Sequence, residues 1–273
     1  MNRLLRIEWL KLKPYRPFWI LVGLYALGLS LVCSGGMFFL EYLRNQGANI
    51  EGLDPTILPL YDFPDVWQNI AYVASIFKVF LGFIIVISVS NDADYGTLRQ
   101  NVIDGMSKKE YLGSKLLFMI MLSLAAGLLL FLIGLITGSI YAQEVDIGLI
   151  FRDLEFLLAY VLSVFTYLTF ALWITLLIPR TGLIIVGLFM YTLIFEPILT
   201  LFLWEYPHTP ETIKALVPYF PVYSVNHLIP IPFPRYILRE IQDYVPQKAT
   251  LIALGWLIVN VGLSYLILKR KDW

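Results

Sequence analysis

The sequence predicts an all-α integral membrane protein, and three observations support this fold class. Hydrophobic residues make up 59% of the 273 residues and charged residues only 15%. With a mean hydropathy of +0.74, this composition lies outside the usual range of soluble domains. The apolar runs reach the roughly 20 residues that a helix needs to cross a hydrocarbon core of about 30 Å. They are uniformly apolar and do not alternate, which favours membrane helices over barrel strands.

Six segments meet this length requirement and predict six transmembrane helices. They cover, approximately, residues 18–40, 70–89, 116–140, 156–178, 183–204 and 251–268. The spans and their connections leave no room for a separate soluble domain of about 100 to 150 residues, so we expect residues 1–273 to form a single transmembrane domain. The first run is longer than the roughly 7 to 15 apolar residues of a signal peptide, and we expect it to remain as a span.

The distribution of Lys and Arg predicts that both termini face the cytoplasm. With this topology the inner segments carry thirteen basic residues, namely Arg3, Arg6, Lys11, Lys13, Arg16, Arg99, Lys108, Lys109, Lys115, Arg180, Lys269, Arg270 and Lys271. The outer segments carry six, namely Arg44, Arg152, Lys214, Arg235, Arg239 and Lys248. Because cytoplasmic loops are enriched in basic residues, we expect a multi-pass protein of the cytoplasmic (plasma) membrane, surrounded by lipid.

A charged island connects the second and third predicted spans, at residues 92–116, "DADYGTLRQNVIDGMSKKEYLGSKL". Leu98, Val102 and Met106 recur at i, i+4 and i+8, which places them on one stripe of a helix. Such a stripe predicts a cytoplasmic coupling helix that docks in a groove of a partner protein. A solvated connector whose lysines only set the topology is the alternative interpretation.

The order of residues in this island resembles the corresponding loop of type-2 ATP-binding-cassette (ABC) transporter permeases. The resemblance rests on Asp92, Gly96, Thr97, Leu98, Arg99, Ser107, Lys108, Tyr111, Leu112 and Lys115. Two positions depart from the family pattern, which usually has Glu in place of Asp92 and often Pro-x-Ser-Arg in place of residues 105–108. The motif covers about a tenth of the chain, and the six-span layout around it strengthens the resemblance.

The resemblance implies the permease (transmembrane) subunit of an ABC exporter, driven by ATP that a separate cytosolic ABC ATPase hydrolyses. ATP and Mg²⁺ would be bound by that partner, and this chain would need no cofactor. Six spans are half of the family's usual twelve, which implies a homodimer or a heterodimer with a second permease. The residues expected to couple to the ATPase are Asp92, Gly96, Thr97, Leu98, Arg99, Val102, Met106, Ser107 and Lys108.

Two further segments resemble parts of the same family. Residues 1–17 resemble the amphipathic connecting helix along the inner membrane surface, with Leu5, Trp9 and Leu12 on one side; a basic leader that sets the topology is the alternative. Residues 205–248 hold eight of the fifteen prolines. The resemblance implies that re-entrant outer helices fill this place and cap the translocation path, and residues 212–216 and 236–244 are the candidates. We prefer a structural cap to the alternative role, substrate recognition.

Lys78 and Glu196 are the only charged residues inside the predicted spans. A lysine near the membrane centre costs about 2.5 to 3.5 kcal/mol on insertion scales, so it should have a partner or a function. A polar patch on a translocation path, with a direct pair between Lys78 and Glu196 as one option, is the functional interpretation of these residues, and we prefer it for Lys78. For Glu196 we prefer the alternative that the fifth span ends near Phe195, so that Glu196 contacts interfacial water.

Gly134 and Gly138 form a G-x-x-x-G in the third span, a pattern suited to close helix packing within or between protomers.

Several function classes lack sequence support. The chain contains no G-x-x-x-x-G-K-[ST], H-E-x-x-H or G-x-S-x-G. His208 and His227 both lie in the proline-rich outer segment with no Cys or His cluster near them, so no metal site is expected. Its net charge of zero argues against binding nucleic acid, and its single cysteine cannot form an intrachain disulfide. A secondary transporter, which would show inverted repeats or several broken spans, is the main alternative to an ABC permease, and a membrane enzyme is the next.

Overall fold

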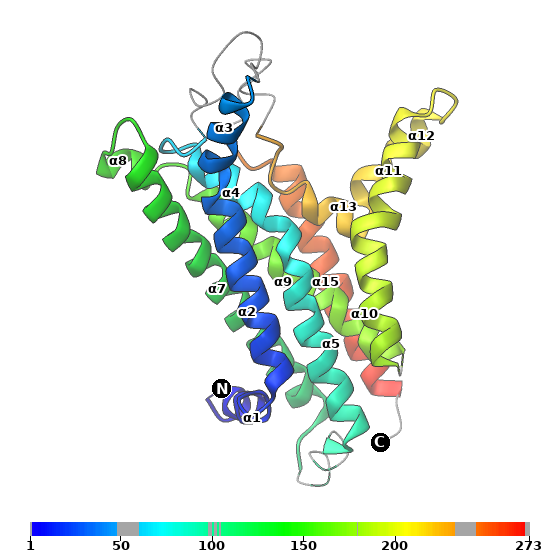
Figure 1. Ribbon diagram of the computed structural model, residues 1–273. Helices are drawn as coiled ribbons and strands as arrows, with labels where there is room; N and C mark the ends of the chain where they lie inside the picture. The colour runs from blue at the N-terminus through cyan, green and yellow to red at the C-terminus, as the bar shows by residue number, and fades with distance from the viewer. Residues whose placement is uncertain are drawn as a thin grey trace.

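The computed structural model describes residues 2–47, 60–97, 100, 103, 105–178, 180–232 and 244–270. Within these residues the regular structure is helical and no strand occurs. Six helical segments are long and apolar enough to cross a membrane, namely Arg16–Ser34, Val66–Asp94, Lys108–Tyr141, Ile147–Leu177, Thr181–Glu205 and Gln247–Arg270. The prediction of an all-helical bundle with six spans is confirmed (Figure 1).

The central element of the bundle is α9 (Glu155–Leu177). It packs against α15 (Gln247–Arg270), α5 (Lys78–Asp94) and α7 (Lys108–Tyr141). Its buried side chains include Tyr160 and Tyr167, and the Tyr160 hydroxyl lies 2.7 Å from that of Tyr25 in α2 (Arg16–Ser34). A buried hydroxyl in a membrane bundle needs such a partner, because the surrounding lipid offers none.

The two glycines of the G-x-x-x-G pattern pack inside this chain. A Cβ on Gly134 would collide with Trp67 and Ile70 of α4 (Val66–Ala74), and one on Gly138 would collide with the Phe63 ring. The absence of a Cβ at these two positions of α7 therefore lets α4 and the turn before it approach closely.

Three predicted spans contain a break in their helix. The first changes at Gly35 from α2 to α3 (Gly36–Asn45). The second consists of α4, a 3-10 turn at Ser75–Phe77 (η2), and α5. The fifth consists of α10 (Thr181–Met190), a π-helical turn at Tyr191–Phe195 (η3), and α11 (Glu196–Glu205). In the second and fifth spans, the first residue after the irregular turn is the intramembrane charge, Lys78 or Glu196.

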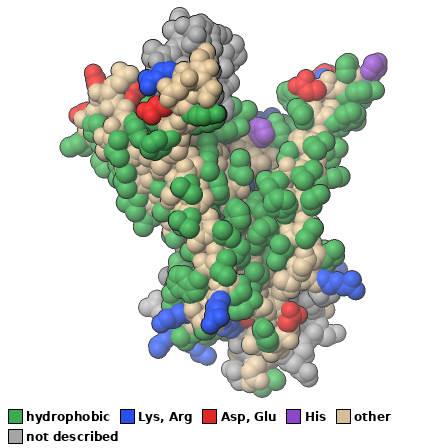
Figure 2. Space-filling model, in the orientation of Figure 1, with side chains coloured by type: hydrophobic (Ala, Val, Ile, Leu, Met, Phe, Trp, Pro, Cys, Tyr) green, Lys and Arg blue, Asp and Glu red, His purple; other side chains and the backbone are tan. Residues whose placement is uncertain are grey.

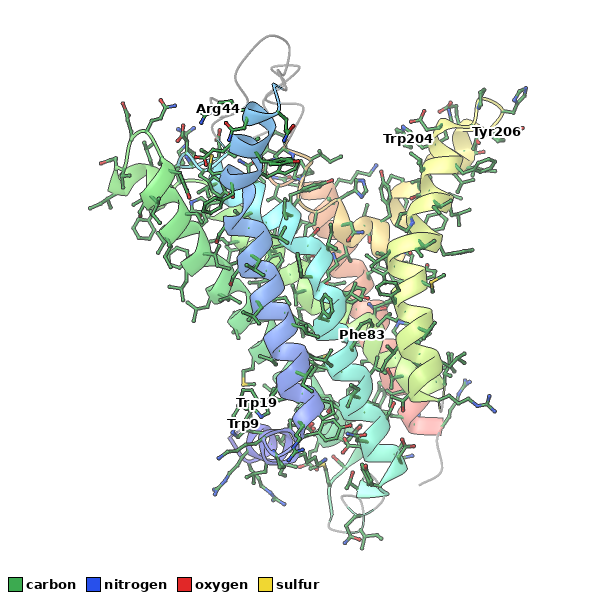
Figure 3. All side chains as sticks on the ribbon, viewed as in Figure 1. Trp9, Trp19, Arg44, Phe83, Trp204 and Tyr206 are labelled. Carbon is green, nitrogen blue, oxygen red and sulfur yellow. The ribbon has the colours of Figure 1, made fainter. Side chains whose placement is uncertain are left out.

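The N-terminal helix α1 (Asn2–Leu12) lies across the end of the bundle, at the same end as the last turn of α15 (Figure 1). It packs against α7, and Trp9 contacts Phe18 and Trp19 edge to face. Figure 3 shows Trp9 and Trp19 at this end and Trp204 and Tyr206 at the other. Partly exposed Trp and Tyr at two levels are typical of the two interfaces of a membrane.

The α10–α11 segment forms an arm that stands apart from the other spans at the upper end in Figure 1. The chain returns from the arm through α12 (Glu211–Lys214), a 3-10 turn at Val217–Tyr219 (η4) and α13 (Pro221–Asn226). Helix α12 overlaps the predicted short helix at 212–216, whereas residues 236–243 of the second predicted helix lie outside the described residues. A further short helix, α8 (Ile147–Ile150), precedes α9.

Candidate functional site

A cluster of four charged side chains joins three helices at the end of the bundle where α1 lies. The Lys115 ammonium of α7 lies 2.6 Å from the Asp92 carboxylate of α5 and 2.6 Å from the Glu8 carboxylate of α1. These three side chains are at most 3% exposed. Lys11 of α1 adds a second ammonium 2.9 Å from Asp92. We call these four residues the ion cluster; it holds two acids and two bases and is balanced in charge.

Hydroxyl groups supply further hydrogen bonds to the ion cluster. The Tyr111 and Thr97 hydroxyls donate to Asp92 at 3.2 and 2.9 Å. The Ser114 hydroxyl donates to Glu8 at 3.3 Å, and Lys115 donates to the Ser88 hydroxyl at 2.8 Å. A buried ion pair is tolerated only when its charges are paired and its remaining hydrogen-bonding groups are satisfied. The ion cluster meets both conditions.

The geometry of the ion cluster explains much of the motif in the charged island. Asp92 and Lys115 are the two ends of that island, so their ion pair closes the loop at its base. Gly96, at φ 64°, ends α5 in a left-handed conformation that glycine favours. Ser107 caps α7, because its hydroxyl accepts from the Glu110 N–H at 3.2 Å while the Glu110 carboxylate accepts from the Ser107 N–H at 2.8 Å.

The predicted coupling residues differ in their surroundings. Asp92, Gly96, Thr97 and Ser107 have structural partners or roles inside the loop. Leu98, Arg99 and Val102 lie outside the described residues. Met106 is non-helical, since it follows Gly105 at φ 90°, and it packs against the core. The Lys108 ammonium donates to the Lys269 carbonyl at 3.3 Å, which ties the loop to α15.

Two exposed apolar side chains of the loop were missed by the sequence reasoning. Tyr95 is 74% exposed and Ile103 is 70% exposed, at the polar end of the bundle. Isolated aromatic and aliphatic residues in a charged segment are the signal that could have identified them. Their exposure makes them better candidates for a protein contact than the buried members of the motif.

The second site surrounds Lys78, at the first residue of α5. Lys78 is 1% exposed, and its ammonium donates to the Asn226 side-chain oxygen at 2.6 Å and to the Ser163 hydroxyl at 3.1 Å. The ammonium also lies 5.8 Å from the centre of the Tyr167 ring, within the range of a cation–π contact. The expectation that Lys78 is shielded and has partners agrees with this geometry.

Glu196, at the first residue of α11, is also 1% exposed. Its Oε1 accepts hydrogen bonds from the backbone N–H groups of Val222 and Tyr223 at 2.8 and 2.6 Å. Its Oε2 has no hydrogen-bond partner in the described part of the chain. The helix continues to Glu205, so Glu196 does not mark the end of the fifth span.

Lys78 and Glu196 do not form a direct ion pair in the described structure; both bind α13 instead. Lys78 holds Asn226 at one end of this helix, and Glu196 holds Val222 and Tyr223 at the other. Sequence reasoning identified the two charges because they stand alone in apolar runs. It missed Asn226 and Ser163, since ordinary polar residues give no comparable signal.

Two cavities beside α13 are lined in part by its last residue, Asn226. The first, of about 250 Å³, is lined by Glu196, Thr200, Trp204, Tyr223, Asn226 and His227 together with apolar residues of α11 and α13. The second, of about 180 Å³, lies toward α4 and shares Asn226 and His227 with the first. The His227 ring stacks on Tyr223 with ring centres 3.6 Å apart. Desolvation lowers the pKa of His227; the hydrogen bond to the Tyr223 carbonyl opposes this shift and the Lys78 charge adds to it, so the neutral imidazole predominates at pH 7.

No group of three or more Asp, Glu, His or Cys residues in the described ranges could hold a metal ion. The two sites consist of paired charges and hydrogen bonds, with cavities beside the second.

The bundle of six apolar spans is that of a multi-pass membrane protein, with buried charges at the breaks of two spans and a clamped loop at one end. The sequence profile described as "ABC-2 family transporter protein" matches residues 3–273. The chain therefore belongs to the ABC-2 transporter family, and the resemblance to a type-2 ABC permease is confirmed. No curated protein matches the sequence.

Proposed function

We propose that this chain is the permease subunit of an ABC exporter, which moves a substrate across the cytoplasmic membrane. ATP and Mg²⁺ are bound and ATP is hydrolysed by a separate cytosolic ATPase. Membership of the ABC-2 family supports transport. The observation that carries the rest is the ion cluster, because it closes the loop between Asp92 and Lys115 and fastens that loop to α1, α5 and α7.

The contacts provide a continuous route for force from the loop to the middle of the bundle. Movement of the loop base displaces α5, a helix of 17 residues, and a helix of this length spans about 25 Å. The far end of α5 is Lys78, which binds Asn226 of α13. Helix α13 in turn binds Glu196, the first residue of α11 in the arm. A push on the loop thus reaches the arm through two charged residues.

Lys78, Glu196 and α13 form the proposed translocation path in this scheme. The path is completed by a second copy of the chain or a second permease, because one six-span bundle is half of the twelve-span assembly that the family resemblance implies. Figure 2 shows many Lys and Arg side chains at the end of the molecule where α1 lies. This distribution supports a cytoplasmic location for both termini.

One observation favours a second candidate function, a secondary transporter. The second and fifth spans of this chain are interrupted, and each interruption is followed by a buried charge. Buried charges at broken helices are expected for ion-coupled sites. Transport assays in proteoliposomes separate the two functions, because an ion gradient without ATP drives only the second.

The proposed function is tested by purifying the tagged chain with the ATPase that accompanies it and measuring ATP hydrolysis in reconstituted vesicles. Tyr95→Asp and Ile103→Asp should each abolish copurification or coupled hydrolysis, because a charge replaces an exposed apolar contact. The matched control is Lys109→Ala, an exposed position in the same segment, which should be mild. Normal coupling in both loop variants would leave the loop as a topogenic connector. ATP-independent transport would overturn the exporter assignment.

A further inference from the structure

We propose that the cavity between α11 and α13 binds the ammonium group of a small cationic ligand with an aromatic or apolar body, and that Glu196 is the residue that recognises the charge. This ligand class gives the proposed translocation path a class of substrate. The assignment of the cavity as a substrate site rests on the proposed function. Binding itself does not require the ATPase.

The hydrogen bonding of Glu196 is incomplete. The side chain is almost fully buried, one oxygen accepts two backbone hydrogen bonds, and Oε2 accepts none from the described residues. The Tyr191 side chain lies near the carboxylate, yet it does not meet hydrogen-bond geometry at Oε2. A buried carboxylate oxygen without a donor is costly. An ammonium ligand would supply the missing charge-assisted hydrogen bond.

The cavity walls carry a negative charge. Among the described residues that line this cavity and its neighbour toward α4, Glu196 is the only one with a formal charge, since His227 is neutral at pH 7. Lys78 is buried behind the walls, where its ammonium is bound to Asn226 and Ser163, and it lines neither cavity. A ligand in the cavity therefore meets a negative charge, which selects cations over anions.

The other walls of the cavity suit a ligand with an aromatic or apolar body. Trp204 and Tyr223 contribute aromatic surfaces, and Pro197 and Leu201 contribute apolar ones. Aromatic faces add a cation–π attraction to an ammonium and pack against an apolar body. The volume of about 250 Å³ lies below the range of about 300 to 1,000 Å³ typical of drug-sized ligands. A compact arylalkylamine is the size of ligand that fits.

The position along α11 indicates how the ligand enters. Trp204 lies near the upper end of the arm, at the level of one membrane interface (Figure 3). Glu196 lies eight residues earlier, about 12 Å deeper at 1.5 Å per residue. A ligand would enter from the interface with its ammonium group leading. A lipid headgroup that stays at the interface would not reach Glu196, so a free cation is the favoured source of the ammonium.

The test is equilibrium dialysis of the full-length chain in dodecyl maltoside micelles, with 2-phenylethylamine as the probe. Two compounds of similar size, 2-phenylethanol and 3-phenylpropionate, report on the neutral and anionic alternatives. We expect the amine to bind most tightly and the carboxylate not to bind. In Glu196→Gln, amine binding should weaken by about tenfold or more, while alcohol binding stays unchanged. Equal binding of amine and alcohol by the wild type would overturn the proposal.

Matched variants keep the test falsifiable. Glu196→Gln retains a carbonyl oxygen for the Val222 and Tyr223 N–H groups, so the fold should persist, which a thermal melt checks. Glu205→Gln removes an exposed acid from the same helix and should change nothing. Trp204→Leu, at a position that is half exposed, should weaken the amine and the alcohol alike. Unchanged amine binding in a folded Glu196→Gln variant would also overturn the proposal.

Added lipids distinguish the two sources of an ammonium group. If phosphatidylethanolamine weakens phenylethylamine binding and phosphatidylglycerol does not, a lipid headgroup occupies the ammonium site. If neither competes, the ligand is a free cation. Both results support the site, whereas competition by phosphatidylglycerol alone would contradict its preference for cations. Because no ATPase is present, failure of this test leaves the proposed ATP-driven function standing.

Discussion

The two charged sites of this molecule solve the problem of buried charge in different ways. In the ion cluster, Glu8, Lys11, Asp92 and Lys115 contact one another directly and balance in charge. In the membrane site, Lys78 and Glu196 are held apart by α13, and one oxygen of Glu196 has no partner in the described structure. The first site is closed and the second has unused binding capacity. Closure suits a site that transmits force, and unused capacity suits a site that binds a ligand.

The largest expected effect is on the closed site. Lys115→Met leaves Glu8 and Asp92 buried with only Lys11 between them. Removing one partner of a buried ion pair typically costs about 3 to 5 kcal/mol, so the variant should unfold well below the wild type in a fluorescence thermal melt. Lys109→Met removes a charge of the same kind from an exposed position and should change stability by at most about 0.5 kcal/mol. If both variants melt together, the ion cluster does not stabilise the fold.

A smaller effect is expected when α1 alone is released. Glu8→Gln keeps the size of the side chain and removes one of the two carboxylates that bind Lys115. Loss of a hydrogen bond to a charged group costs about 1.5 to 3 kcal/mol. Limited proteolysis should then cleave within Asn2–Leu12 faster than in the wild type while the spans remain intact. Cleavage at the wild-type rate would show that α1 is held by its apolar contacts.

The open site should respond in function more than in stability. Lys78→Met removes a charge whose insertion costs about 2.5 to 3.5 kcal/mol, but it leaves the Asn226 side-chain oxygen without its donor, at about 1 to 3 kcal/mol. The Ser163 hydroxyl keeps its hydrogen bond to the Val225 carbonyl. The two terms are of similar size and opposite sign, so the melting temperature should change little. Transport coupled to ATP hydrolysis should be lost. A stabilised variant with normal transport would remove Lys78 from the translocation path.

The smallest perturbation tests which side of the membrane each site faces. A cysteine at Ser107, in a chain with Cys33→Ser, should be labelled by a membrane-impermeant maleimide only after the inner face is opened. Ser107 is exposed and caps α7, so the label meets no steric barrier. Labelling in intact cells would invert the topology and exchange the positions of the two sites.

The sequence predicted the six spans well because span length and apolarity are properties of the local chain. It did not predict the breaks at Ser75–Phe77 and Tyr191–Phe195. Neither turn contains Gly or Pro, and both lie in apolar runs that match a continuous helix. Only Pro197, just beyond the second break, hinted at an irregularity. The charged residues that follow the two breaks, Lys78 and Glu196, contact residues distant in the sequence, and the local pattern does not reveal such contacts.

The sites were predicted in part for the same reason. Asp92 and Lys115 stood out in the charged island, and Lys78 and Glu196 stood out as lone charges in apolar runs. Glu8 was one charge among several in a basic segment, and its partner Lys115 lies 107 positions away. No local pattern connects residues at such a separation. The binding partners on α13 were hidden for the same reason.

The irregular turns before Lys78 and Glu196 divide two spans into jointed rods. The lower rod of the second span is anchored by the ion cluster, while its upper rod, α4, is locked against the glycine face of α7. In the fifth span the upper rod, α11, is attached to the bundle through α13. The six-residue helix α13 therefore binds the residue that follows each irregular turn, Lys78 in one span and Glu196 in the other. We expect a rotation of that helix to tilt the two rods together, which would change the shape of the protein around α13 while the ion cluster stays closed.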